Sequence, residues 1–140
     1  YLNKMNTEIK NMAAVLATTI WADGVYDEAE KVSVEEIAEA FEVETDELVS
    51  AVETELEAIK EMDEESVNEY LLEASSHVDE EDAEMMLQAA LQIATVDGIL
   101  CEVEVENILS IATALGVNEA RAVLMLVDLV KEEPELKVEL

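Results

Sequence analysis

Two stretches of the chain follow the same pattern: residues 22–30 read ADGVYDEAE, and residues 96–104 read VDGILCEVE. In each copy an Asp-Gly pair is followed by two apolar residues, and glutamates stand five and seven positions after the Asp. Glycine readily takes the left-handed conformation that ends a helix, and acidic residues favour the first turn of the next one. The pattern therefore predicts a helix, a tight turn and a second helix at two places in the chain.

The repeat extends beyond these two stretches. With the same offset of 74 residues, Ile37 matches Ile111 and Val49 matches Val123. This period is too long for one unit of a solenoid. We therefore expect two half-repeats, about 5–62 and 80–132, that pack around a pseudo-two-fold axis and are joined by a linking helix at about 64–77. The predicted fold is all-α, a single compact domain over residues 1–140.

The chain has only three Gly and one Pro, the residues that most often end a helix. Long stretches rich in Ala, Leu, Glu and Met favour helix, and no segment keeps the alternation of a half-buried strand. The spacing predicts seven helices, at about 5–22, 27–42, 45–62, 64–77, 80–96, 101–115 and 118–132. The expected N-caps are Asp27, Thr45, Asp63, Asp79 and Asn118. Gly116 is expected to end the sixth helix, and Pro134 the seventh.

Composition restricts the class of protein. The chain has 140 residues, is 51% hydrophobic and carries a formal net charge of −29. So many aliphatic residues indicate one folded domain with its own core rather than a disordered acidic chain. The charge argues against nucleic acids as partners and disfavours anionic membrane surfaces, because binding to their phosphates relies on Lys and Arg. An acidic surface attracts cations and basic protein surfaces instead. No apolar run reaches the ~20 residues of a membrane span. A single Cys predicts no internal disulfide, and we expect a cytoplasmic protein.

The seventh predicted helix differs from the others. Apolar residues surround it, whereas the other helices carry an apolar stripe opposite an acidic face. A helix that is apolar all round is central in a fold or lies in an oligomer interface. The sequence therefore predicts one of these two positions for residues 118–132. The apolar residues are Ala122, Val123, Leu124, Met125, Leu126, Val127, Leu129 and Val130.

The repeated carboxylates are candidate metal ligands. Each Asp ends one helix and each second Glu lies in the first turn of the next, so the chain reversal brings the two together. Two such pairs related by the pseudo-symmetry supply four oxygen donors: Asp23, Glu30, Asp97 and Glu104. Carboxylates with no His or Cys set favour Ca²⁺, Mg²⁺ or Mn²⁺ over Zn²⁺ or Cu⁺.

Two other interpretations apply to these turns. An EF-hand loop is excluded, because Thr19 and Ile93 would stand at its first ligand position and both continue a helix. A structural role is the stronger alternative: the Asp residues shape the turns through local hydrogen bonds, and Glu30 closes a capping box on Asp27. Cys101 stands where the first copy has Asp27 and is a poor N-cap, yet Glu104 is retained. This detail favours a further role for the acidic residues.

Other residues point to structure rather than to chemistry. We interpret His77, the single histidine, as a surface or capping residue. Trp21 and Tyr26 flank the first Asp-Gly turn and are interpreted as core anchors. The chain has no phosphate-binding glycine loop and none of the nucleophile or zinc motifs of hydrolases, so we expect no enzymatic activity.

The duplicated helix–Asp-Gly–helix pattern resembles the tellurite-resistance TerB-like family. The residues that carry the resemblance are Ala22-Asp23-Gly24 with Glu30, and Val96-Asp97-Gly98 with Glu104. The resemblance implies an all-helical fold of about seven helices with internal pseudo-symmetry, found alone or fused to DnaJ-type co-chaperones. It also implies a metal site at Asp23, Glu30, Asp97 and Glu104. Val96 in place of Ala, and Cys101 in place of a polar residue, depart from the family pattern.

Two hypotheses for function follow. The first is a non-enzymatic TerB-like domain that binds a divalent cation between its half-repeats, with a role in stress response, tellurite resistance or metal homeostasis. The second is a metal-free acidic interaction module, co-chaperone-like in character, that binds a basic protein partner or forms a homo-oligomer through the seventh helix.

Overall fold

The computed structural model describes residues 5–140, so the first four residues of the predicted domain lie outside the described residues. Seven α-helices are present over this range, which confirms the predicted all-α class. Their bounds lie within a few residues of those expected. They are α1 Ile9–Asp23, α2 Glu28–Ala40, α3 Thr45–Ile59, α4 Glu64–Ser76, α5 Ala83–Ala94, α6 Glu102–Leu115 and α7 Glu119–Glu132.

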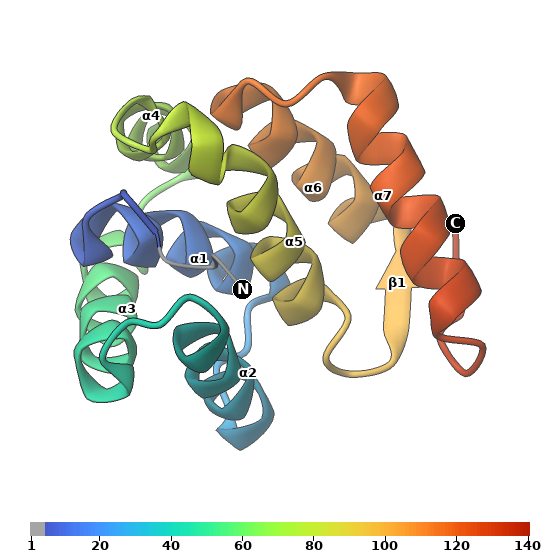
Figure 1. The fold of residues 1–140 in the computed structure, drawn as a ribbon, viewed down its shortest axis with the longest axis horizontal. Helices are drawn as coiled ribbons and strands as arrows, with labels where there is room; N and C mark the ends of the chain where they lie inside the picture. Colours follow the sequence, from blue (N-terminus) through green and yellow to red (C-terminus); the bar gives the residue numbers. More distant parts are fainter. Residues whose placement is uncertain (1–4) are drawn as a thin grey trace.

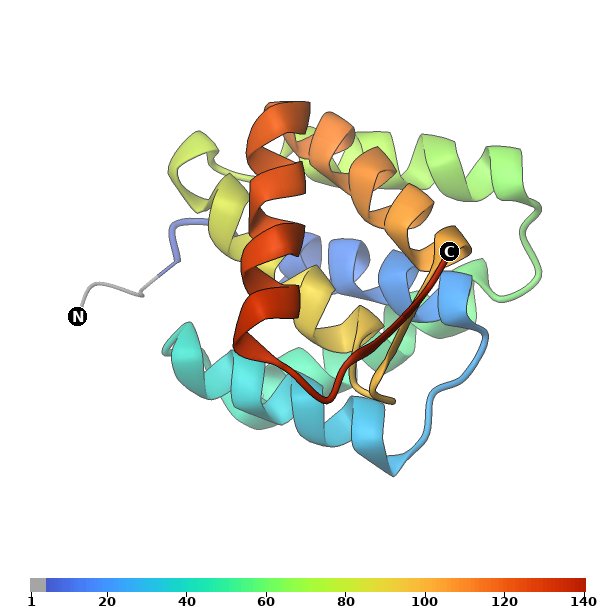
Figure 2. The same ribbon diagram turned by 90° about the vertical axis from the view of Figure 1, so that its right-hand side faces the viewer.

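The helices are arranged around a buried central pair, α1 and α5. α1 packs on α5, on α3 and α4, and on α6 (Figure 1). α2 and α3 lie on one side of this pair, while α4 and α6 lie on the other (Figure 2). All nine residues from Met12 to Ile20 of α1 are buried, because neighbours cover the helix on every side. α1 is therefore the helix around which the core is assembled.

The N-cap predictions are confirmed at most helix starts. Asp63 accepts the Ser66 N–H at 2.8 Å, and Asn118 accepts the Ala120 N–H at 2.8 Å. Thr45 was wrongly placed: Glu44 is the N-cap of α3, Thr45 is its first residue, and the Glu44 side chain makes no capping bond. At the C-terminal ends, Gly116 has the predicted left-handed conformation, with φ of 79°.

The fifth predicted helix begins differently from the expectation. Asp79 caps a short 3-10 turn, Glu80–Asp82, and α5 starts only at Ala83. The buried Asp82 carboxylate accepts the N–H of Thr7 at 2.9 Å and also the Thr7 hydroxyl. This contact fastens the chain ahead of α1 to the start of the second half of the protein.

A small sheet, which the sequence did not predict, closes the C-terminal end. β1 (Ile99–Cys101) pairs in parallel with β2 (Lys137–Glu139), with Leu100 opposite Val138. The chain leaves α7 before Pro134 and returns beside the second Asp-Gly turn (Figure 2). Strands of three residues are too short to show an alternating pattern, so the sequence carries no signal for this pairing.

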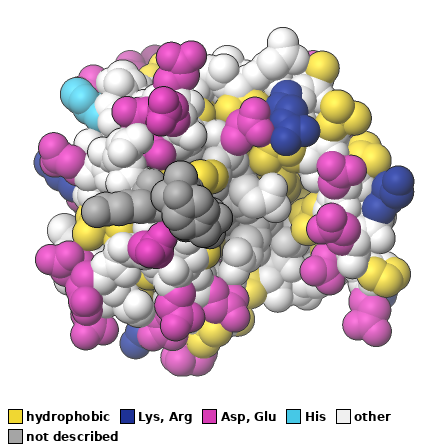
Figure 3. All heavy atoms as spheres, viewed as in Figure 1, with side chains coloured by type: hydrophobic (Ala, Val, Ile, Leu, Met, Phe, Trp, Pro, Cys, Tyr) yellow, Lys and Arg dark blue, Asp and Glu magenta, His cyan; other side chains and the backbone are white. Residues whose placement is uncertain are grey.

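The prediction for the seventh helix was wrong in one of its two forms. α7 is not central: it packs on α6 and α5 at the edge of the fold, and only three of its residues are buried. Its outer side forms what we call the α7 strip: Val123, Leu124, Val127 and Val130, which are 42, 55, 47 and 36% exposed. On the face shown in Figure 3, apolar side chains gather on the α7 side. The oligomer-interface form of the prediction stays a prediction.

The starts of the helices follow the sequence repeat. α2 and α3 begin at Glu28 and Thr45, and α6 and α7 begin 74 residues later, at Glu102 and Glu119. The pseudo-two-fold packing of the two half-repeats stays a prediction. Among residues 5–140, no helix has the length and apolar character needed to cross a membrane.

Candidate metal centre

The first Asp-Gly turn joins α1 to α2. Asp23 is the last residue of α1, and Gly24 follows with φ of 82° and donates its N–H to the Ile20 carbonyl at 2.9 Å. Asp27 then caps α2, because its carboxylate accepts the Ala29 N–H at 3.0 Å. Glu30 closes the predicted capping box by accepting the Asp27 N–H at 3.1 Å. The structural interpretation of Asp27 and Glu30 is therefore confirmed.

The second Asp-Gly turn joins α5 to α6 by another route. α5 ends at Ala94, so Asp97 lies in the connecting turn rather than at the end of a helix. Its carboxylate accepts the Ile99 N–H at 3.0 Å, the local bond that the structural alternative predicts. Glu104 accepts the Cys101 N–H at 2.9 Å, but the Cys101 side chain does not cap α6. Both contacts of a capping box are present in this copy as well, but a thiol that makes no capping hydrogen bond takes the place of the Asp27 carboxylate.

Three of the four predicted acidic residues come together. Carboxylate oxygens of Asp23, Asp97 and Glu104 all lie within 4.8 Å of one another, and we call this group the carboxylate cluster. Asp23 and Asp97 are exposed, whereas Glu104 is half-buried. The cluster joins residues from both copies of the repeated stretch, as the sequence predicted.

Glu30 does not belong to this group. Its side chain is only 3% exposed and is held against the first residues of α2 by its bond to Asp27. Burial raises the pKa of Glu30 above its usual range, and the hydrogen bond and charge of Asp27 raise it further. The structure therefore places the fourth predicted ligand in the capping box of the first turn, beside the cluster.

Burial and neighbouring charges disfavour the ionised form of two carboxylates in the cluster. Burial raises the pKa of Asp23, and repulsion by Asp97 and Asp27 adds to the rise. Burial also raises the pKa of Glu104, with smaller contributions from the charges of Asp97 and Asp23. A cation placed between these groups would replace mutual repulsion with attraction. Three oxygen donors without a nitrogen or sulfur ligand suit a hard cation.

A comparison with protein families shows which family the chain belongs to. The family model described as Tellurite resistance protein TerB matches residues 10–125. The chain belongs to the TerB family. The match spans both Asp-Gly turns and ends within α7, so the whole carboxylate cluster lies in the TerB region. No curated protein and no solved structure matches the chain.

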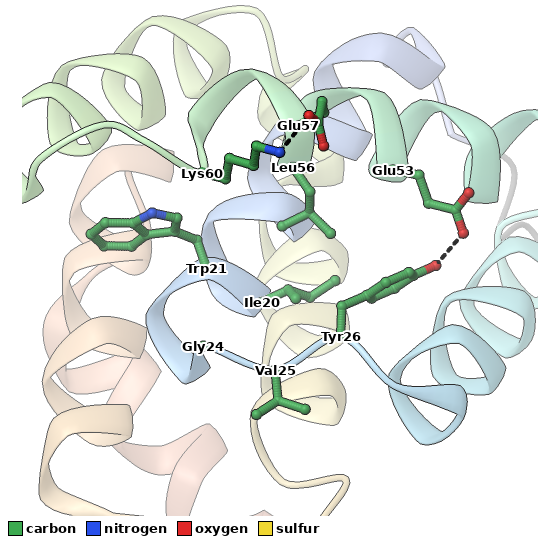
Figure 4. Close-up of a pocket in the computed structure, with 9 residues that line it drawn as sticks. All are labelled: Ile20, Trp21, Gly24, Val25, Tyr26, Glu53, Leu56, Glu57 and Lys60. Atoms are coloured by element: carbon green, nitrogen blue, oxygen red, sulfur yellow. Dashed lines mark hydrogen bonds and ion pairs between the residues drawn. The ribbon is translucent and has the colours of Figure 1, made fainter.

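The TerB chain also has a surface pocket that the sequence did not predict. Trp21 and Tyr26, interpreted as core anchors, do contact the core, but both are half-buried and line a hollow between the end of α1 and α3 (Figure 4). The other wall comes from α3, about 30 residues away, and no sequence pattern links the two walls. The one feature of the sequence that could have indicated this pocket is the pair of aromatic residues around the first Asp-Gly turn.

The structure places His77 where the sequence predicts it. His77 follows the last residue of α4 as its C-cap, and its side chain is 57% exposed. The ring nitrogen lies 3.1 Å from the Glu73 carboxylate in the preceding turn. This confirms a surface and capping role.

Proposed function

We propose that this TerB chain is a non-enzymatic protein that binds one divalent cation at Asp23, Asp97 and Glu104. The observation that carries the proposal is the mutual approach of the three carboxylates to within 4.8 Å. Oxygen ligands lie about 2.0–2.6 Å from Mg²⁺ or Ca²⁺, so two ligands of one ion are at most roughly 5 Å apart. The separation in the cluster therefore suits a shared ion.

The choice among cations follows from the donor set. Mg²⁺ keeps several waters and is commonly held by one or two carboxylates, whereas Ca²⁺ takes 6–8 oxygen ligands and tolerates irregular geometry. Three carboxylates on an exposed rim leave room for water ligands in either case. Ca²⁺, Mg²⁺ and Mn²⁺ are therefore the candidate ions, and direct competition between them ranks their affinities.

The bound cation would join two distant parts of the chain. Asp23 ends α1, while Asp97 and Glu104 flank β1, so an ion at the cluster ties the central helix to the second half of the protein. A ligand that binds only the folded state raises the free energy of unfolding. We propose that this coupling serves metal homeostasis or the stress response, including resistance to tellurite.

Terbium luminescence tests the proposal. Trp21 is the single tryptophan and lies two residues before Asp23, so its excitation sensitises a Tb³⁺ ion held at the cluster. Saturable emission that Ca²⁺ or Mg²⁺ displaces is expected from the wild type and is expected to be lost in Asp23→Asn/Asp97→Asn. The control is Glu65→Gln/Glu69→Gln, which removes two exposed charges elsewhere. Equal emission from all three proteins would mean that Tb³⁺ binds non-specifically to the acidic surface, and it would contradict a site at the cluster.

The α7 strip supports a second candidate, an interaction module that self-associates or binds a partner. Four apolar side chains, each at least 36% exposed, lie on one outer helix. Contiguous exposed apolar groups are typical of protein interfaces. The net charge of −29 opposes dimerisation at low salt, and salt screens that repulsion.

Light scattering during size-exclusion chromatography tests this second candidate. The dimer fraction of the wild type is expected to rise from low to high salt. Leu124→Lys, which places a charge in the most exposed position of the strip, is expected to stay monomeric at both salt concentrations. A wild type that is monomeric throughout would remove the dimer version of this candidate.

A further inference from the structure

The pocket beside the first Asp-Gly turn has the size of a ligand site. Its volume is about 500 Å³, within the roughly 300–1,000 Å³ that is usual for such sites. Ile20 and Leu56 lie in the middle of the pocket, with Trp21 on one side and Tyr26 on the other (Figure 4). Val25, 49% exposed, extends its apolar surface outward.

The pocket combines aromatic rings with carboxylates. Glu53 and Glu57 line it from one side of α3, a single helical turn apart, and both are exposed. The Tyr26 hydroxyl donates to Glu53 at 2.9 Å. Burial raises the pKa of Tyr26, and the bond to Glu53 and nearby glutamate charges raise it further. The surroundings of the ring are therefore anionic, and they attract a cation that the ring face also favours.

The protein already places one cation of its own at this pocket. The Lys60 ammonium lies 2.6 Å from the Glu57 carboxylate, and its chain runs on the Trp21 side of the pocket (Figure 4). The Lys60 side chain is 55% exposed and that of Glu57 is 70% exposed. Exposed ion pairs of this kind are weak, so a better-placed cation from outside can replace Lys60.

We propose that this pocket docks an arginine side chain from a basic, partly apolar segment of a protein partner. Guanidinium groups stack on aromatic faces and pair with carboxylates in a planar fork. Tyr26 and Glu53 offer both at one end of the pocket, and Trp21 offers a second ring at the other end (Figure 4). The net charge of −29 steers basic partners toward the chain.

A segment of a protein fits this pocket better than an enclosed small molecule. Gly24, Val25 and Glu53 are exposed, so the pocket is an open groove whose rim a neighbouring backbone can approach. Apolar residues next to the arginine would cover Val25. The pocket shares no lining residue with the carboxylate cluster or the α7 strip, so the proposal stands independently of both candidate functions.

A peptide titration followed by NMR tests the docking. The probe is the acetylated and amidated heptapeptide Ala-Ala-Leu-Arg-Leu-Ala-Ala, and its control has citrulline, a neutral isostere, in place of arginine. Saturable shifts are expected at the Trp21 indole N–H and the Val25 amide, with Kd at least tenfold weaker for the citrulline peptide. Equal affinity for both peptides, or for free argininamide and the arginine peptide, would overturn the proposal.

Charge variants separate the pocket from the general acidity of the surface. Glu53→Gln/Glu57→Gln is expected to weaken binding at least tenfold, whereas Glu65→Gln/Glu69→Gln, with equal charge and spacing on α4, is expected to change it less than twofold. Lys60→Met removes the internal competitor and is expected to tighten binding more than Lys131→Gln does. Equal effects of the two glutamate pairs would show that net charge alone attracts the peptide, and they would overturn the proposal that arginine docks in this pocket.

Discussion

The two Asp-Gly turns share the same pattern of Asp, Gly and two Glu residues, yet they use their glutamates differently. In the first turn the Asp27 carboxylate caps α2 with two hydrogen bonds, and Glu30 is buried in the capping box. In the second turn the equivalent residue is Cys101, its side chain does not cap α6, and Glu104 stays half-buried beside Asp97 and Asp23. One copy is thus specialised for helix capping, while the other contributes two of the three residues in the carboxylate cluster.

This difference shows how a duplicated motif can divide two roles. A capping box with a hydrogen-bonding side chain at the N-cap stabilises a helix start and holds its glutamate in a fixed local position. With no carboxylate at the N-cap of α6, Glu104 keeps one bond to the Cys101 N–H and faces the acidic residues of the other turn. The first turn, by contrast, contributes Asp23 alone to the cluster.

The glycines are the feature that the two turns share, and replacing them should have the largest effect. Gly24 and Gly98 have φ of 82° and 80°, where a Cβ is strained even though no atom lies within 4 Å of its position. Gly24→Ala and Gly98→Ala are each expected to lower the free energy of unfolding by about 1–2 kcal/mol. Urea denaturation measures both. A large loss in only one variant would show that the turns are not equivalent in backbone strain.

The capping residues distinguish the turns. Asp27→Ala is expected to lower the free energy of unfolding by about 1 kcal/mol, because two N–H groups of α2 lose their acceptor. Cys101→Ala removes no capping bond and should change it by less than half of that. Equal losses in chemical denaturation would contradict the division of roles.

A capping residue can also be restored to the second turn. Cys101→Ser offers a hydroxyl to the first N–H groups of α6 without adding charge beside the cluster. The free energy of unfolding is expected to rise by about 0.5 kcal/mol, at the lower end of N-cap effects. The same substitution should leave Tb³⁺ binding unchanged. A loss of stability would mean that the Cys101 thiol already contributes to the start of α6.

The smallest expected effect is a dependence of stability on alkaline pH that only the first turn has. Its Tyr26 can lose a proton, whereas the equivalent residue of the second turn is the buried Leu100. Burial, followed by the bond to Glu53, raises the pKa of Tyr26 above the ordinary value of 10.0. The folded state therefore holds this proton more tightly, and stability falls as pH rises above that value. Tyr26→Phe is expected to lose less stability between neutral and alkaline pH than the wild type. Identical losses in parallel denaturation series would contradict the assignment.

Much of the fold could be predicted because local signals set it. Apolar spacing and caps such as Asp63 and Asn118 located the helices, and the repeat correctly brought Asp23, Asp97 and Glu104 together. The position of α7 could not be predicted, because apolar composition does not say whether a face has a neighbour. β1 and β2 pair over three residues across a long sequence separation, and no local pattern encodes such a contact.

The exclusion of Glu30 from the cluster has a similar cause. Its position seven residues after Asp23 matches that of Glu104 after Asp97, so the sequence treats the two glutamates alike. Their environments differ because α1 continues to Asp23, whereas α5 ends three residues before Asp97. The path of the backbone through each turn, rather than the spacing of acidic residues, decides which carboxylates meet.

Denaturation with and without Ca²⁺ tests the central claim most directly, by comparing the wild type with Asp97→Asn and Glu30→Gln. At Ca²⁺ a hundredfold above Kd, the wild type and Glu30→Gln are each expected to gain about 2.7 kcal/mol of unfolding free energy. Asp97→Asn is expected to gain almost nothing, and to be slightly more stable than the wild type in chelator because repulsion on Asp23 and Glu104 is relieved. An equal gain in Asp97→Asn and the wild type would contradict a cation site at the carboxylate cluster.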